Sequence, residues 1–390
     1  MICFSNTNTA LFFSKIDEIP SEIWEDLDCT KNFYFHPNYL NSLEKNHPKI
    51  NFTYIVLIDN DKKPTAIAHL KIVDFHLNSI KNDLEFLRNI GKKLHIIPDN
   101  KPLKLLICGN IFVSGEHGIF IKKNEDKNAI LKELAESINH FLNLNKDLKK
   151  KIDAFLIKDF VNESLLITDE LKDFNYHPFS VEPNMKLELQ ENWQTFDDYL
   201  AAMKTKFRVK AKRALTLSEN LKIEDVTLNN IDEKLPKMTA LYEKVTSKAD
   251  FNLASFNLET YKDFKAKLGD NYILKTYWVN DKIVGFMSAA INQKSLDAHF
   301  VGIDYQLNRE HAIYQRILYD YIEIAISKKL KTINFGRTAS EIKSSIGAVP
   351  QDLTMYLRHK KSITNKILKL FLQRVQPTPF RQNFPFKLKN

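Results

Sequence analysis

The sequence predicts an α/β chain with mixed α+β sheets, folded as two tandem domains that each place helices against one mixed β-sheet. Three observations support this prediction. The chain has 390 residues, and domains of roughly 100–200 residues make two the expected number. Hydrophobic residues form 44% of the chain, which is enough to fill two cores. The same order of strand and helix patterns also occurs once in each half.

Each half begins with a helical segment and a hairpin. The helical patterns lie at residues 37–46 and 258–268. Residues 52–72 and 272–291 each contain two β-rich runs separated by Asn-Asp-Lys. Turn-forming residues between two such runs predict an antiparallel strand pair at the start of each half.

Each hairpin is followed by a strand, a helix and another strand. Strand patterns at 104–115 and 151–160 enclose a helix with an apolar stripe, and patterns at 295–307 and 331–337 enclose a second helix. The first stripe consists of Ile130, Leu131, Leu134, Ile138, Phe141 and Leu142. A strand, a helix and a strand in this order form a right-handed crossover with parallel strands. The repeated order indicates an internal duplication, although similar topologies also recur for physical reasons alone.

Composition and missing motifs exclude several classes of protein. The cysteines, Cys3, Cys29 and Cys108, include no C-x-x-C pair, so neither a disulfide framework nor a cysteine zinc site is expected. The N-terminus lacks signal-peptide features, and no run of about 18 apolar residues occurs, so we expect a cytoplasmic protein. The sequence contains no G-x-G-x-x-G, P-loop, H-E-x-x-H or G-x-S-x-G motif. Dinucleotide binding, phosphoryl transfer and serine hydrolysis therefore lose support, and no metal is expected.

Three segments of the second half carry a more specific resemblance. They are YLAAMKTKFRVKAKRA from 199, VGIDYQLNREHAIYQRILYDYIE from 301 and NFGRTASEIKSSIGAVP from 334. They resemble the basic helix, the strand-to-helix turn and the Phe-Gly-Arg segment of the Fem-like branch of the GNAT acyltransferase superfamily. The match covers most of residues 193–359, whereas the first half matches only in topology. The resemblance implies tandem GNAT-like domains and an activity like that of the aminoacyltransferases of peptidoglycan cross-bridges.

We therefore expect an N-terminal GNAT-like domain over residues 1–185 and a C-terminal one over 186–362. The C-terminal domain has the better-matched motifs and should carry the active cleft. Residues 363–390 form a basic amphipathic tail with an end rich in proline and phenylalanine. This tail could lie on an anionic membrane surface, at the inner membrane face, or it could pack back over its own domain.

The Phe-Gly-Arg segment indicates a ligand site at a strand end. Gly336 ends a parallel strand, and ligands bind outside the carboxyl ends of strands in open α/β sheets. Thr338 and Glu341 have the spacing of a capping box, so a helix should begin there. Gly347 is well placed to end that helix in a left-handed conformation.

Cofactor-binding residues are predicted at this segment and at the strand-to-helix turn. Arg337 would lie beside a helix N-terminus, where it and Lys343 would favour binding of a phosphate or carboxylate. Alternatively, Arg337 is a surface residue that pairs with Glu341. Ordinary GNAT proteins bind coenzyme A at a glycine-rich turn. The corresponding turn at 304–312 has no glycine, which leaves the acyl donor open. The predicted set is Asn308, Arg309, Gly336, Arg337 and Lys343.

A basic helix is predicted near residues 197–217. Its apolar stripe is flanked by six cations between Lys204 and Arg213 with no acidic residue between them. Such a run is often only a solvated helix face, but the resemblance implies that it borders the substrate cleft and binds an anion. The residues predicted to bind substrate are Lys206, Arg208 and Arg213, and the arginines suit bidentate phosphate contacts better.

Acyl transfer to an amine needs a proton acceptor, donors for the developing oxyanion, and good positioning. His299 and Asp304 are the candidate proton acceptors, and Tyr314 or Tyr319 is the candidate donor to a leaving group. A partly buried imidazole and a tyrosine on a packing face would also explain His299 and Tyr314.

We predict an N-acyltransferase that moves an acyl group from an acyl-CoA co-substrate to an amine acceptor in cell-envelope or lipid precursor synthesis, without a tightly bound cofactor. One alternative is transfer from aminoacyl-tRNA, which the net charge of +9 favours. The other is a non-catalytic protein that binds RNA or another partner on the same fold.

Overall fold

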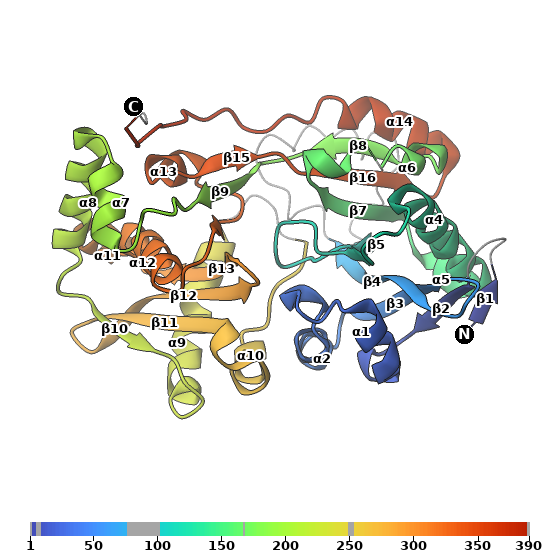
Figure 1. Cartoon of the computed structure of the whole chain (residues 1–390), viewed down its shortest axis with the longest axis horizontal. Coiled ribbons are helices and arrows are strands. Elements are labelled where there is room, and N and C mark those ends of the chain that lie inside the picture. The colour runs from blue at the N-terminus through green and yellow to red at the C-terminus, as the bar shows by residue number, and fades with distance from the viewer. Residues whose placement is uncertain (1, 5–8, 76–101, 167, 249–252, 388–390) are drawn as a thin grey trace. The chain divides into compact units, whose positions relative to one another are not determined.

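The computed structural model describes residues 2–4, 9–75, 102–166, 168–248 and 253–387 (Figure 1). The chain forms two compact units. The first comprises Met1–Glu182, Asp250–Phe256 and Asp352–Pro377, and the second comprises Pro183–Ala249, Asn257–Gln351 and Thr378–Asn390. Each unit contains its own mixed β-sheet with helices, which confirms the predicted fold class. The chain passes from the first unit to the second after Glu182, and residues 352–377 belong to the first unit, where they supply a strand to its sheet.

The described strands of the first unit form a nine-stranded sheet with the order β1-β2-β3-β4-β5-β7-β16-β8, and β6 also pairs with β4. Among the pairs described, β5 and β7 are parallel and the others are antiparallel. The strands are β1 (Ile2–Phe4), β2 (Thr9–Phe13), β3 (Asn51–Ile58), β4 (Pro64–Phe75), β5 (Leu103–Cys108), β6 (Ile119–Ile121), β7 (Ala154–Phe160), β8 (His177–Ser180) and β16 (Thr354–His359).

Helix α4 supplies much of the core of this unit. Its buried Ile130, Leu131, Leu134, Ile138 and Leu142 pack with apolar residues of the sheet, as the predicted stripe requires. Helix α2 spans the residues predicted for it. The helices are α1 (Ser21–Leu27), α2 (Pro37–Asn46), α4 (Lys127–Leu144), α5 (Lys146–Lys151), α6 (Glu170–Asp173) and α14 (Ser362–Leu372), with short 3₁₀ turns at Ile16–Glu18, Phe33–Phe35 and Asn162–Ser164.

The second unit has a seven-stranded sheet with the order β10-β11-β12-β13-β14-β9-β15. Its strands are β9 (Asn184–Glu188), β10 (Lys222–Asp225), β11 (Tyr272–Val279), β12 (Lys282–Asn292), β13 (Ser295–Ile303), β14 (Thr332–Asn334) and β15 (Val349–Gln351). Its helices are α7 (Phe196–Ala202), α8 (Thr205–Leu217), α9 (Ile231–Thr246), α10 (Thr260–Leu268), α11 (Tyr305–His311), α12 (Ile313–Ser327) and α13 (Ser340–Ser345), with a 3₁₀ turn at Gly269–Asn271.

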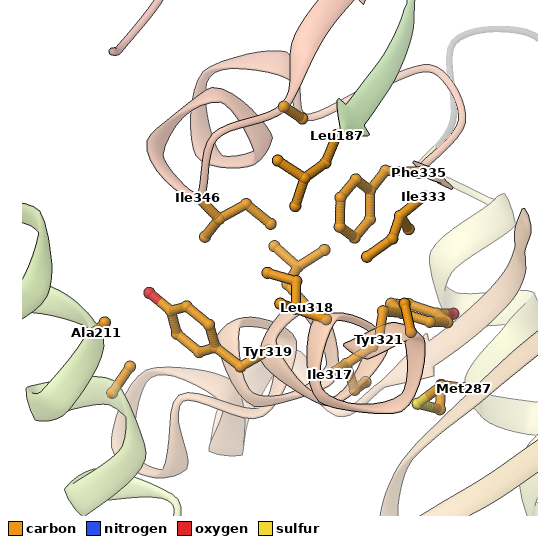
Figure 2. Close-up of a cluster of buried hydrophobic side chains, with 14 of the residues drawn as sticks. Leu187, Ala211, Met287, Ile317, Leu318, Tyr319, Tyr321, Ile333, Phe335 and Ile346 are labelled. Carbon is orange, nitrogen blue, oxygen red and sulfur yellow. The ribbon is translucent and has the colours of Figure 1, made fainter. Parts of the chain in front are cut away.

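Helix α12 lies at the centre of the second core. Figure 2 shows Ile317, Leu318 and Tyr321 of this helix among side chains from the sheet and Ile346, which directly follows α13. All three are at most 1% exposed. Burying each large apolar side chain contributes about 1.5–3 kcal/mol, so this helix fixes the position of the loops at its two ends.

The two sheets share one topology. The hairpins β3–β4 and β11–β12 confirm the predicted repeat, as do the parallel pairs β5–β7 and β13–β14. In each sheet the strand next to the second parallel strand comes from a distant part of the sequence: β16 pairs with β7, and β9 pairs with β14. The long predicted strand at 295–307 is wrong beyond Ile303, because Asp304 caps helix α11, which begins at Tyr305.

The C-terminal segment divides between the units. Helix α14 belongs to the first unit, and residues from 378 belong to the second. There Phe386 pairs with Met203 in an isolated β-bridge, and the Lys387 N–H donates to the Ala202 carbonyl at 3.1 Å. The end of the tail therefore packs back over the second unit. No helix in the described part of the chain is both long and apolar enough to cross a membrane.

Candidate functional site

The Phe-Gly-Arg segment joins three of the predicted residues in the second unit. Lys343 is 4% exposed, and its Nζ donates to the carbonyls of Phe335, Gly336 and Arg337 at 2.8, 3.2 and 2.7 Å. Burial lowers the pKa of Lys343 to about 7. The structure thus brings Gly336, Arg337 and Lys343 together, but Lys343 holds the loop backbone instead of lying open to a ligand.

The backbone of this loop is left-handed at several positions. Gly336, Thr338 and Ala339 have φ of +72°, +68° and +50°. The predicted capping box is wrong: α13 begins at Ser340 after Ala339, which makes no side-chain cap. A β-branched residue rarely adopts positive φ, so the backbone at Thr338 is strained. Strained residues often cluster at functional sites, which supports a site at this strand end.

Gly347 ends α13 as predicted. Its φ is +103°, its N–H donates to the Ser344 carbonyl at 3.0 Å, and the Ala348 N–H donates to the Lys343 carbonyl at 3.1 Å. These two bonds form a Schellman motif. A Cβ at Gly347 would meet the ring of Phe386 at 2.2 Å, so the packed tail also requires glycine here.

The strand-to-helix turn brings Asp304, Asn308 and Tyr314 together. Asp304 caps α11 by accepting from the Gln306 N–H at 3.0 Å, and Asn308 Oδ1 accepts from the Tyr314 N–H at 2.8 Å. Both side chains therefore satisfy backbone groups at helix starts. Arg309 is exposed on α11. Burial raises the pKa of Tyr314, so its phenol stays protonated at neutral pH.

His299 lies on neither loop. It is half-buried on β13, and its ring centroid is 5.5 Å from that of Tyr272 on β11. This contact matches the alternative of a partly buried imidazole.

Helix α8 presents the predicted basic surface. Ala211 and Ala214 are buried, and Figure 2 shows Ala211 near Tyr319 of α12. The predicted single helix divides into α7 and α8 at Met203. Among its cations, Arg208 is half-buried, and none has a carboxylate partner in the described part of the chain; the exposed ones are Lys206, Lys210, Lys212 and Arg213.

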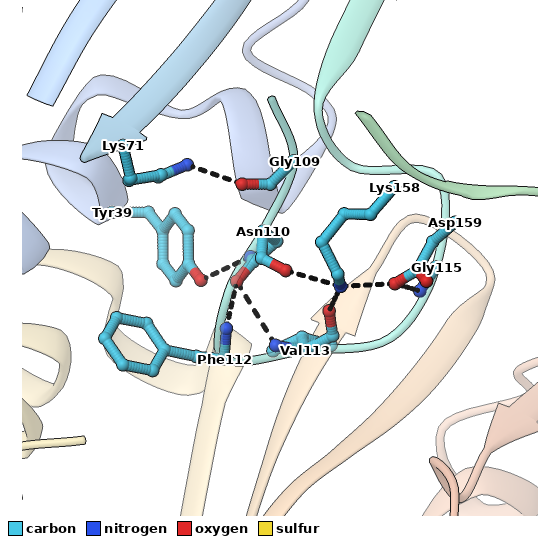
Figure 3. A network of polar contacts seen from close by, with 9 residues as sticks. All are labelled: Tyr39, Lys71, Gly109, Asn110, Phe112, Val113, Gly115, Lys158 and Asp159. Atoms are coloured by element: carbon cyan, nitrogen blue, oxygen red, sulfur yellow. Dashed lines mark hydrogen bonds and ion pairs between the residues drawn. The ribbon is translucent and has the colours of Figure 1, made fainter. Parts of the chain in front are cut away.

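A buried polar network in the first unit was not predicted (Figure 3). Lys158 and Asp159 of β7 form an ion pair, and their side chains are 6% and 0% exposed. Lys158 Nζ also donates to the Asn110 carbonyl at 2.7 Å, and Asp159 Oδ2 accepts from the Gly115 N–H at 3.2 Å. The pair therefore holds the loop that follows β5.

Asn110 and Lys71 complete this network. Asn110 Nδ2 donates to the Tyr39 hydroxyl at 2.8 Å, and Lys71 Nζ donates to the Gly109 carbonyl at 3.0 Å (Figure 3). Lys71 Nζ also contacts His69. Lys71 is 1% exposed, and burial holds its pKa well below the usual range. Burial likewise lowers the pKa of His69. The network therefore places the buried Lys71 amine beside the end of β5, where it binds the Gly109 carbonyl.

The position of this network follows from where two parallel strands separate. Pairing between β5 and β7 stops at Cys108 and Ile157, and the polar residues follow directly on each strand. In the second unit, pairing between β13 and β14 stops at Asp297 and Asn334, just before the Phe-Gly-Arg segment. A sequence signal was present, because Lys158 and Asp159 interrupt an otherwise apolar strand.

No group of three or more His, Cys, Asp or Glu residues that could hold a metal ion occurs among the described residues.

Two mixed sheets, each with one parallel pair among its described strands that separates at polar loops, define a tandem GNAT-type fold. The crystal structure of FemX aligns with 87% of this chain and 96% of its own, with 11% identity and a TM-score of 0.52. A tandem GNAT protein of the clavulanic acid biosynthesis pathway aligns over 90% and 99%, with 9% identity and a TM-score of 0.50.

A match over most of the sequence identifies the family of this chain. Residues 113–382 match the FemAB-like family, which is described as peptidoglycan biosynthesis/recognition. The chain belongs to this family and has its acyltransferase-type fold. No curated protein matches the sequence.

Proposed function

We propose that this protein is an aminoacyltransferase of cell-envelope precursor synthesis, which transfers an aminoacyl group from a tRNA donor to an amine acceptor. The observation that carries the proposal is helix α8. It has five cations, no acidic residue and no carboxylate partner in the described part of the chain. A cluster of this kind suits the phosphate backbone of an RNA.

The turn before α12 favours RNA over coenzyme A as the donor carrier. A pyrophosphate cradle needs free N–H groups at a helix N-terminus, and glycines so that the ligand can approach. Here the Tyr314 N–H already donates to Asn308, and the preceding residues form α11. An acyl-CoA donor, which the superfamily suggests, stays the second candidate because Arg337 lies at the strand end that commonly binds such ligands.

The reaction needs few protein groups. The acceptor amine attacks the ester carbonyl, the C–N bond forms, the C–O bond to the tRNA ribose breaks, and the amine proton passes to the leaving oxygen. We assign the proton acceptor to His299 or Asp304 and the donor to Tyr314, whose phenol keeps its proton because burial raises its pKa. The family description supports an acceptor from the cell envelope.

The test is salt-dependent binding of bulk tRNA to the full-length protein. Arg208→Gln/Arg213→Gln should weaken binding and reduce the slope of log K against log salt by about 1.5, since each lost phosphate contact contributes about 0.7–0.9. Lys282→Gln/Lys328→Gln is the matched control, because both lysines are exposed in the same unit but lie outside α8. Arg337→Ala should leave tRNA binding largely intact.

Thermal unfolding with acetyl-CoA, a long-chain acyl-CoA and tRNA separates the candidates, because a ligand that binds only the folded state raises Tm. Acyl-CoA would replace tRNA as the proposed donor if an acyl-CoA raises Tm, Arg337→Ala abolishes that rise, and tRNA does not raise Tm. Binding of tRNA without any transfer to an amine would indicate the non-catalytic RNA-binding alternative.

A further inference from the structure

We propose that the first unit binds a phosphate-bearing ligand of at least two negative charges in a basic cavity of about 620 Å³, here called the α4–α14 pocket. The pocket is formed by the second half of α4, the end of β16 and the first turns of α14. Its cations are Lys149, Arg358, Lys360, Lys366 and Lys369, and no Asp or Glu is among its lining residues. This site is separate from the transfer chemistry proposed above.

Most of these cations lack a carboxylate partner. Lys360 pairs with Asp153 at 3.0 Å. Lys149 donates to Asn143 Oδ1 at 2.7 Å, and Lys366 and Lys369 form no ion pair in the described part of the chain. Positive charges gathered around one cavity repel each other, so an anion with several charges relieves that repulsion.

Arg358 is held in a fixed position. Its guanidinium carbon lies 4.4 Å from the centroid of the Phe155 ring and 4.9 Å from that of Tyr176, and Nη2 donates to Asn139 Oδ1 at 2.9 Å. Its buried Nε finds no hydrogen-bond partner among the described residues. A fixed guanidinium with a spare N–H is well suited to a phosphate oxygen, which would satisfy that donor.

The wall of the pocket is a built structure. Asn365 is 6% exposed; its Oδ1 accepts from the His359 N–H and its Nδ2 donates to the Asn175 carbonyl, both at 2.8 Å. His177 and His359 also line the cavity. Burial, together with Lys369, lowers the pKa of His177, and a bound anion would raise it again.

The cavity is larger than one phosphate ion, so the ligand carries its phosphate on a larger body. Two sources fit this chemistry. One is a soluble diphosphate compound. The other is an anionic lipid headgroup, because Ile363 and Leu370 of α14 are 77% and 61% exposed beside the pocket residues Lys366 and Lys369.

Calorimetry of the full-length protein with inorganic pyrophosphate at constant ionic strength tests the proposal. We expect saturable binding that Lys366→Gln/Lys369→Gln weakens by about tenfold or more, equivalent to about 1.4 kcal/mol. The control is Lys132→Gln/Lys361→Gln, which removes the same charge from exposed positions on α4 and before α14, outside the pocket. Pyrophosphate should also raise the pKa of His177 in an NMR titration.

Co-sedimentation with vesicles of phosphatidylcholine containing phosphatidic acid separates the two sources. A lipid headgroup is identified if the protein binds the vesicles, pyrophosphate displaces it from them, and Ile363→Ser/Leu370→Ser abolishes the binding. Pyrophosphate binding without vesicle binding identifies a soluble ligand. Absence of saturable binding in both assays, or equal weakening by the pocket and control variants, would overturn the proposal. Neither result depends on tRNA binding by α8.

Discussion

The two units use one topology but stabilise the end of their parallel strand pair in different ways. In the first unit, Lys158 and Asp159 form a buried ion pair that binds the loop after β5. In the second unit, the single amine of Lys343 binds three carbonyls of the loop after β14. The fold therefore fixes where a polar site can form, whereas the charge of that site depends on side chains that the topology does not determine.

The largest effect is expected from breaking the ion pair of the first unit. Asp159→Asn keeps a residue that tolerates the φ of +69° but leaves the Lys158 ammonium buried without its carboxylate. We expect a loss of about 3–5 kcal/mol in the free energy of unfolding, measured by urea denaturation. The double variant Lys158→Met/Asp159→Asn should lose less than Asp159→Asn alone. A loss below 1 kcal/mol for the single variant would show that the pair does not hold this strand end.

The two glycines that flank α13, Gly336 and Gly347, should differ in how much stability an added Cβ costs. Gly347→Ala should cost about 3 kcal/mol, because its Cβ would overlap the Phe386 ring and its φ is +103°. Gly336→Ala should cost only about 1–2 kcal/mol, since no described atom beyond its two chain neighbours lies within 4 Å of the added Cβ and only the left-handed backbone opposes it. Equal losses of Tm in the two variants would contradict the packing of the tail on Gly347.

A smaller effect is expected on the pH dependence of the free energy of unfolding, to which the buried amine of Lys343 contributes. Its pKa is lowered from 10.5 to about 7, so the unfolded state binds more protons between these values and stability rises with pH across that window. Between pH 7 and pH 9 the gain should be about 2 kcal/mol relative to Lys343→Met, which has no titrating amine. Parallel stability curves for the wild type and Lys343→Met would show that the amine is not buried as described.

Local patterns predicted the parts of the fold that local interactions determine. Both Asn-Asp-Lys turns, helix α2 and the apolar stripe of α4 were correct, because turn chemistry and periodicity need no tertiary information. Gly347 was also assigned correctly as a helix end. The start of α13 was not, because the three carbonyls bound by Lys343 and the left-handed backbone override the capping-box spacing.

The candidate site was less predictable. Lys343 has the sequence neighbourhood of a ligand-binding cation, and only packing shows that its amine points to its own backbone. Asn308 was assigned to a cofactor, whereas the break between α11 and α12 uses its side chain as a cap. Lys71 and Lys158 were visible in the sequence as charged residues within apolar strands. Their contacts with the same loop after β5 join residues distant in sequence, so local patterns could not predict them.

The most direct measurement of the central claim is a transfer assay with two labelled donors. The full-length protein is incubated with a nucleotide-linked peptidoglycan precursor and either radiolabelled aminoacyl-tRNA or radiolabelled acetyl-CoA, and base-stable label on the precursor is counted, since an amide survives the mild base that hydrolyses the ester. We predict label on the precursor from aminoacyl-tRNA, at a rate that Arg208→Gln/Arg213→Gln lowers. Label from acetyl-CoA alone, or no label from either donor, would contradict the proposed transfer.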